Sequence, residues 1–244
     1  MSVGIKATVL DVSIDTVTMS EAVVKLEQFI AEKTPHLVAT ANAEMVMLAQ
    51  EDNELAAILA NSHLVVPDGA GVVWAIRHQG NTIVERVAGY DLAQNLLLEA
   101  SKKGYRVFLF GSQPDIVAKA KTMALARYPG LCIVGTKHGF FTAEDEPAIV
   151  QTISAAKPDI LLAALGVPRQ EKWLAKNLEK LGVPICMGVG GTFDVMAGAV
   201  KRAPLWMQRT SLEWLFRLLC QPQRAIRMLA LPKFALKVML RKKD

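Results

Sequence analysis

Short runs of apolar residues alternate with longer amphipathic segments over the first 190 residues. Six runs are nearly continuous in apolar residues, namely 36–40, 63–66, 105–110, 131–135, 159–165 and 184–189. Such runs are typical of parallel strands that helices cover on both faces. Residues 90–104 and 114–128 between them have helical spacing, with Gly104 placed to stop the first helix and Pro114 to begin the second. The pattern predicts an α/β fold with a Rossmann-like, mostly parallel sheet sandwiched by helices.

The pattern changes near residue 200. Residues 204–220 and 222–243 are expected to form two helices separated by Pro222, without further strands. Residues 201–244 hold eleven Lys or Arg and two acidic residues, a net charge of +9, whereas the whole chain carries +5. This asymmetry indicates that residues 201–244 form a separate unit that binds an anionic partner. We therefore predict an α/β domain over 1–199, which would carry any catalytic site, and a basic helical appendage over 200–244.

Composition narrows the class of protein. An apolar content of 52 % over 244 residues is that of a folded chain with a sizeable core. The three cysteines, Cys132, Cys186 and Cys220, lie far apart and form no CxxC pair, so reduced thiols are expected. The first residues lack the pattern of a signal peptide, and no apolar run reaches the roughly 18 residues of a membrane span. A cytoplasmic location fits best.

Polar residues and glycines follow the predicted strands where the chain leaves the sheet, and ligands bind at that edge of open parallel sheets. These residues are Thr40 and Asn42, then Asp68 between Pro67 and Gly69, then Gly111 and Ser112, then Gln170, and finally Gly190, Gly191 and Asp194. Pro-Asp-Gly is also a common turn sequence, so Asp68 could serve only the turn. Gly111 and Ser112 could hold a phosphate at a helix N-terminus or form only the turn, and Gln170 could be a solvated side chain.

Several site types are not indicated. The GVGGTFD sequence at 188–194 departs from G-x-G-x-x-G, because Phe193 stands at the third glycine, so a nicotinamide cofactor is weakly supported. No P-loop, H-E-x-x-H or compact Asp-x-Asp sequence is present, and the four histidines share no ligand spacing. We expect neither a metal nor another cofactor.

The appendage mixes basic and large apolar residues. Lys233, Lys237 and Arg241 are four residues apart and form one helical stripe. Most of the remaining face is filled by Phe234, Leu236, Val238, Met239 and Leu240. This composition suits a helix lying in an anionic membrane interface, with a helix packed on the domain as the alternative. Nucleic acid is not expected, because Leu and Met replace the polar readers that it needs.

Three arginines stand apart from the lysine stripe. Arg217, Arg224 and Arg227 surround the predicted break at Pro222, and arginine suits bidentate binding of phosphate. They could wrap around a diphosphate.

Five motifs together resemble the WecG/TagA/CpsF family of bacterial glycosyltransferases. They are PDGAGVVWA, GSQPD, LGVPRQEKW, GVGGTFDVMAGAVKRAP and LEWLFRLLCQPQRAIR, in the family's order and spacing. The likeness as a whole runs from about residue 9 to residue 230. The resemblance implies inverting transfer of N-acetylmannosamine from a UDP donor to undecaprenyl-diphosphate-N-acetylglucosamine, forming a β-1,4 link in wall teichoic acid linkage-unit synthesis. It also implies a peripheral position at the inner face of the cell membrane and no required metal.

The resemblance also implies residue roles. Asp68 would be the catalytic base, and Thr40, Asn42, Arg86 and Gln170 would line the sugar pocket. Asp194 and the glycine loop 188–191 would lie at the nucleotide. Arg217, Arg224 and Arg227 would close over the site and meet the diphosphates. In GSQPD, Asp115 stands where many relatives have glycine, and this departure counts against an anion contact at the start of that helix.

Other hypotheses stay open. A relative could use another UDP-sugar, such as a mannosaminuronate or glucose donor. The chain could instead be a nicotinamide-dependent oxidoreductase or a non-catalytic nucleotide-sensing membrane adaptor. The sequence leaves the oligomeric state open, and a homo-oligomer is possible.

Overall fold

The computed structural model describes residues 6–80, 85–210, 212–220 and 228–241, without the side chains of residues 209 and 217. The strands are β1 (Lys6–Val9), β2 (Val12–Asp15), β3 (His36–Ala41), β4 (Leu64–Pro67), β5 (Arg106–Gly111), β6 (Cys132–Lys137), β7 (Ile160–Ala164) and β8 (Ile185–Gly188). The helices before residue 200 are α1 (Met19–Glu32), α2 (Ala43–Ala49), α3 (Asn53–Ala60), α4 (Ala70–His78), α5 (Gly89–Lys103), α6 (Pro114–Arg127), α7 (Glu146–Ala155), α8 (Arg169–Leu181) and α9 (Thr192–Met196). After it come α10 (Leu205–Arg209), α11 (Glu213–Cys220) and α13 (Ala230–Leu240).

The six predicted strands form one parallel sheet in the order β4-β3-β8-β7-β5-β6. Each lies within two residues of its predicted bounds. Helix α5 ends at Gly104, which adopts the left-handed conformation, and α6 begins at Pro114, as predicted. The sheet confirms the predicted α/β class.

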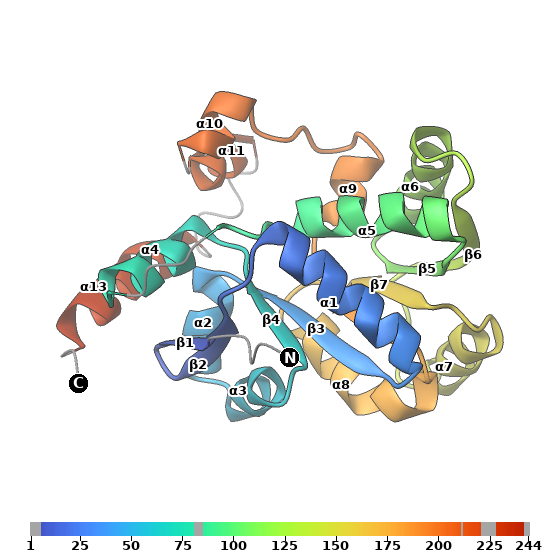
Figure 1. Ribbon diagram of the computed structural model, residues 1–244, viewed down its shortest axis with the longest axis horizontal. Coiled ribbons are helices and arrows are strands. Elements are labelled where there is room, and N and C mark those ends of the chain that lie inside the picture. Colours follow the sequence, from blue (N-terminus) through green and yellow to red (C-terminus); the bar gives the residue numbers. More distant parts are fainter. Residues whose placement is uncertain (1–5, 81–84, 211, 221–227, 242–244) are drawn as a thin grey trace.

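Helices cover the sheet on both faces (Figure 1). Alternate strand residues such as Val38 and Leu162 pack with α1, α5, α6 and α9 on one face. Residues of the opposite pleat, such as Ala39 and Leu161, pack with α2, α3, α4, α7 and α8. This two-sided burial explains why the strands are continuously apolar in sequence.

A short antiparallel hairpin, β1 paired with β2, was not predicted. Strand β1 alternates exposed and buried positions, whereas β2 is buried at three of its four positions, and four residues are too few for either pattern to stand out in the sequence. The turn is made by Leu10 and Asp11, both with positive φ, rather than by the Asn-Gly pair that marks such hairpins in sequence.

The described residues after 200 are mainly helical, as predicted, but the helices are divided differently. Residues 204–220 contain two helices, α10 and α11, instead of one. The chain turns between them, where the Leu212 N–H donates to the Met207 carbonyl (2.8 Å). In Figure 1 both helices project from the edge of the α/β domain. The predicted break at Pro222 lies outside the described residues.

Helix α13 lies beside α4 and packs against α2 and α4 (Figure 1). Phe234 and Val238, which we expected to face a membrane, are instead 1 % and 4 % exposed and belong to the hydrophobic core. They are buried because the neighbouring helices present apolar side chains to them. Arg241 of the predicted stripe pairs with Asp11 in the β1–β2 turn through two hydrogen bonds (2.5 and 3.1 Å). Leu236, Met239 and Leu240 remain exposed.

Candidate active site

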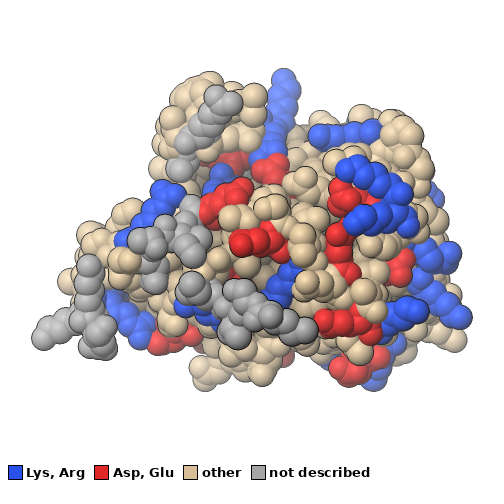
Figure 2. All heavy atoms as spheres, viewed as in Figure 1, with Lys and Arg blue, Asp and Glu red and all other residues tan. Residues whose placement is uncertain are grey.

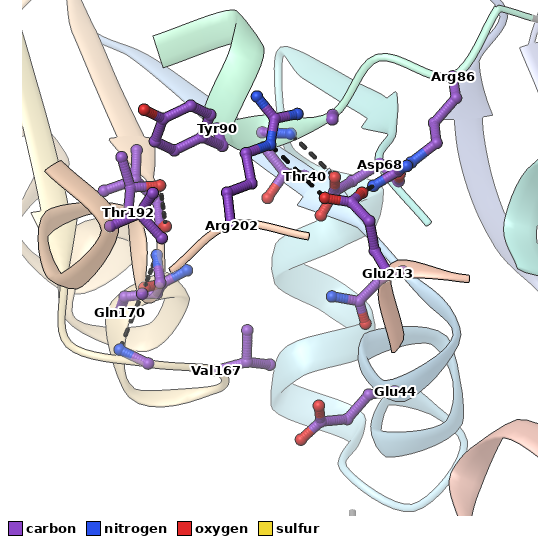
Figure 3. A pocket seen from close by; sticks show the side chains of 18 residues that line it. Thr40, Glu44, Asp68, Arg86, Tyr90, Val167, Gln170, Thr192, Arg202 and Glu213 are labelled. Carbon is purple, nitrogen blue, oxygen red and sulfur yellow. Dashed lines mark hydrogen bonds and ion pairs between the residues drawn. The ribbon is translucent and has the colours of Figure 1, made fainter. Parts of the chain in front are cut away.

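A polar pocket of about 160 Å³ lies where the carboxyl ends of β3, β4, β7 and β8 meet (Figure 3). Seven predicted site residues line it, namely Thr40, Asn42, Asp68, Arg86, Gln170, Gly190 and Gly191. The volume is below the roughly 300–1,000 Å³ of typical ligand sites, so in this arrangement the pocket encloses only part of a large ligand. The topology thus brings residues from distant parts of the sequence to one edge of the sheet.

Asp68 stands in the turn between β4 and α4. Its N–H donates to the Ala41 carbonyl (2.9 Å), and its carboxylate accepts a hydrogen bond from the Gly89 N–H (2.9 Å). The following Gly69 is close-packed, because a Cβ there would lie 3.0 Å from the Asn42 Cβ. The turn interpretation of Pro-Asp-Gly is therefore confirmed, and the turn places a half-buried carboxylate at the pocket. The catalytic role of Asp68 stays a prediction.

Asn42 caps helix α2, since its Oδ1 accepts the Met45 N–H (3.0 Å). Thr40, at the end of β3, packs against Gly89, where an added Cβ would lie 3.0 Å from the Thr40 Cγ2. The strand end, the cap of α2 and the start of α5 are therefore in close contact around Asp68. These contacts leave little freedom for that wall of the pocket.

Gln170 is 1 % exposed, so the solvated interpretation of this side chain is wrong. Its Oε1 accepts the N–H groups of Gly166 and Gly190 (3.1 Å each), and its Nε2 donates to Glu171 Oε1 (2.8 Å). A Cβ at Gly188 would lie 2.6 Å from the Gln170 Nε2. Gln170 thus ties the loop after β7 to the loop after β8, and both loops line the pocket.

Glu171, beneath this loop contact, is 2 % exposed, and burial raises the pKa of its carboxyl to about 7. The hydrogen bond from Gln170 opposes the rise by favouring the carboxylate, but desolvation dominates. A buried carboxyl whose pKa lies near neutrality is therefore in hydrogen-bond contact with Gln170, which lines the pocket.

Arg86 and Arg202 bring positive charge to the pocket. The Arg86 Nε donates to the backbone carbonyl of Asp68 (2.6 Å), and its guanidinium forms an ion pair with Glu213. Arg202 makes two 2.6 Å hydrogen bonds to the Asp91 carboxylate and lies 4.7 Å from the centre of the Tyr90 ring.

Several residues that line the pocket were not predicted from the sequence. Arg202, Glu213 and Tyr90 line the pocket, and so do Glu44 and Thr192. Arg202 and Glu213 lie inside motifs of the family resemblance, which is the signal that could have found them. Glu213 also pairs with Arg86, which lies far away in the chain, so local spacing contains no sign of that contact.

Other predicted residues lie away from the pocket or outside the described part of the chain. Gly111 and Ser112 do not line it: the Ser112 N–H donates to the Ala164 carbonyl (2.9 Å), and Gln113 is the N-cap of α6. Asp194 lies in the first turn of α9, next to the lining residue Val195. Arg217 lies in α11 without a described side chain, and Arg224 and Arg227 are outside the described residues. Their roles stay predictions.

Two features of the described residues bear on cofactors and membranes. No group of three or more His, Cys, Asp or Glu residues there could hold a metal ion. In the same part of the chain, no helix has the length and apolarity needed to cross a bilayer. The described pocket presents the carboxylates of Asp68, Glu44 and Glu213 together with guanidinium, hydroxyl and amide groups.

Comparisons with known proteins agree with this chemistry. Two relatives carry the name N-acetylglucosaminyldiphosphoundecaprenol N-acetyl-beta-D-mannosaminyltransferase. The one from Bacillus subtilis is 37 % identical over 218 residues, covering 89 % of this chain and 84 % of the relative. The one from Bacillus spizizenii is 36 % identical over 202 residues, covering 83 % and 78 %. A model of the glycosyl transferase WecG/TagA/CpsF family matches residues 7–244, and the chain belongs to that family.

Proposed function

We propose that this protein transfers N-acetylmannosamine from UDP-N-acetylmannosamine to undecaprenyl-diphosphate-N-acetylglucosamine. The product would carry a β-1,4 link and serve the linkage unit of wall teichoic acid. Membership of a glycosyltransferase family and the names of two relatives at 36–37 % identity support this activity. The structural observation that carries it is the Asp68 carboxylate, held by the Gly89 N–H at the pocket.

Asp68 acts as the general base. It takes the proton from the acceptor hydroxyl while that oxygen attacks the anomeric carbon on the face opposite the leaving UDP. One displacement with one base inverts the anomeric centre, and a positioned base contributes about 10²–10⁴-fold to the rate. The turn limits the movement of the carboxylate, which favours this role.

The leaving UDP develops negative charge, and positive groups of the protein stabilise it. Arg217, Arg224 and Arg227 are proposed for this task, with Asp194 and the 188–191 loop at the nucleotide. Sugar contacts are assigned to Thr40, Asn42 and Arg86. Gln170 acts on the sugar pocket by holding its two loops together, since its Oε1 and Nε2 both bind protein groups. No metal or other cofactor enters the proposal.

The lipid acceptor places the reaction at an anionic membrane surface, on the inner face of the cell membrane. Leu205, Trp206, Trp214 and Leu219 of α10 and α11 are exposed, and among the described atoms of this lobe Figure 2 shows mostly uncharged residues on the face in view. Together with Lys233 and Lys237 on α13, they provide the apolar and basic groups of an interfacial anchor.

Product analysis tests the function. The purified protein is incubated with short-chain lipid-diphosphate-N-acetylglucosamine and a panel of UDP-sugars, and the products are identified by mass and linkage analysis. We expect transfer of N-acetylmannosamine only. Transfer of glucose or a mannosaminuronate would reassign the donor, and oxidation of a substrate by a nicotinamide cofactor would refute the assignment to sugar transfer.

A further inference from the structure

Glu213, the first residue of α11, is an acidic side chain of the basic appendage that reaches into the pocket of the α/β domain. It is 7 % exposed although α11 projects from the domain. Its carboxylate forms an ion pair with the guanidinium of Arg86 and lies 3.6 Å from the Nε of Arg202. Figure 3 shows the carboxylate between the two guanidinium groups.

Arg86 connects this carboxylate to Asp68. While one end of its guanidinium pairs with Glu213, the Nε donates to the backbone carbonyl of Asp68 (2.6 Å). The Asp68 side chain is held separately by the Gly89 N–H. The Arg86 guanidinium therefore contacts the turn that carries the proposed base on one side and the Glu213 carboxylate on the other.

Arg202 is already fixed by other groups. It forms two hydrogen bonds with Asp91 and stacks on Tyr90, so its position does not depend on Glu213. Two guanidinium groups that face the same space repel each other unless an anion lies between them. Glu213 supplies that anion, and losing one partner of a mostly buried ion pair leaves the remaining charge unpaired.

We propose that Glu213 is a positioning residue that couples docking of α11 to the geometry of the base. When α11 docks, the Glu213 carboxylate enters between Arg86 and Arg202, and Arg86 then holds the Asp68 turn. When α11 leaves, Arg86 loses its partner and the turn loses one of its supports. The inference rests on the proposed function for its catalytic part, whereas the docking contact can be tested without substrate.

The first test compares Glu213→Gln with Glu146→Gln in the full chain. Glu146 is a matched control, because it is also a partly buried carboxylate in an ion pair (2.7 Å to the Lys176 Nζ), but it lies on α7 outside the pocket. We expect Glu213→Gln to lower kcat about 10- to 100-fold while the KM for the donor changes by less than about 3-fold. Glu146→Gln should leave both constants unchanged.

Hydrogen exchange supplies the readout that needs no catalysis. Amides of α10 and α11 should exchange faster in Glu213→Gln than in the wild type, while those of α5 and α8 keep their protection. Unchanged exchange in α10 and α11 would overturn the docking contact, even if the wild-type protein transferred no sugar. Faster exchange with unchanged kcat would overturn the positioning role.

A double-mutant cycle tests whether Glu213 acts through Arg86. If it does, Glu213→Gln added to Arg86→Gln should lower kcat by less than about 3-fold beyond Arg86→Gln alone, because coupled residues are not additive. Fully additive losses would refute action through Arg86. If the wild-type protein itself is inactive on every donor, the proposed function has failed, and the exchange result alone judges the docking contact.

Discussion

Truncation of Phe234 to Ala tests how firmly the last described helix is joined to the domain. Phe234 is 1 % exposed, packs in the core cluster shared by α2 and α4, and lies 3.7 Å from the position of a Cβ added at Gly71. Truncating such a Phe costs about 3–5 kcal/mol, through lost transfer energy and the cavity that remains. For a chain of this length, each kcal/mol lowers Tm by about 2–4 °C, so we expect a fall of about 6–20 °C.

The assay is thermal unfolding combined with hydrogen exchange, because α13 could separate from the domain before the sheet melts. In that case the exchange of residues 230–240 should accelerate while the Tm of the sheet changes less. Leu236→Ala is the matched control: it changes the same helix at a side chain that is 54 % exposed, so stability should stay within about 0.5 kcal/mol. The reasoning fails if Phe234→Ala changes neither the melting curve nor the exchange of α13.

Three further predictions concern the pocket. Asp68→Asn keeps an oxygen for the Gly89 N–H, so the fold and donor binding should persist while kcat falls by at least about 10²-fold; near-normal turnover would remove Asp68 as the base. The raised pKa of Glu171 adds stability below pH 4.5 that is lost as the pH rises through about 7, a difference of about 3 kcal/mol. Denaturant unfolding of Glu171→Gln should therefore show a flatter dependence on pH between 4.5 and 8, and a dependence equal to that of the wild type would contradict the burial argument. A chelator should change the transfer rate by less than about 2-fold, and a large loss restored by a divalent ion would reveal a metal requirement.

The sheet was predictable because its strands are buried on both faces, and strands of that kind consist of consecutive apolar residues. The position of Asp68 at the pocket was predictable for a related reason. A charged residue between Pro and Gly at the end of an apolar run is easily recognised in the sequence. The β1–β2 hairpin was missed because its four-residue strands and Leu-Asp turn resemble ordinary loop sequence. Periodicity identifies long elements much better than short ones.

The burial of Phe234 and Val238 was not predictable from α13 alone. An apolar face on a basic helix fits a membrane and a neighbouring helix equally well, and only the positions of α2 and α4 decide between them. The bridge from Arg86 through Glu213 to Arg202 is hidden for the same reason. Each of these three side chains could equally well be exposed to solvent. Their pairing is favourable only once the segments that carry them lie together in the fold.

The strand order has a consequence for how the pocket comes into being. Within the described sheet, β3 and β4 form one group and β5 to β8 another, and the β3–β8 pairing joins them. Asp68 and Asn42 belong to the first group, and Gly166 and Gly190 to the second. Because β3 and β8 are farther apart in sequence than any other paired strands of this sheet, their pairing carries the highest loop-closure cost among them and is expected late in folding. The pocket therefore exists only in chains in which β3 and β8 have paired. A ligand that binds there stabilises the complete sheet relative to every partly folded form.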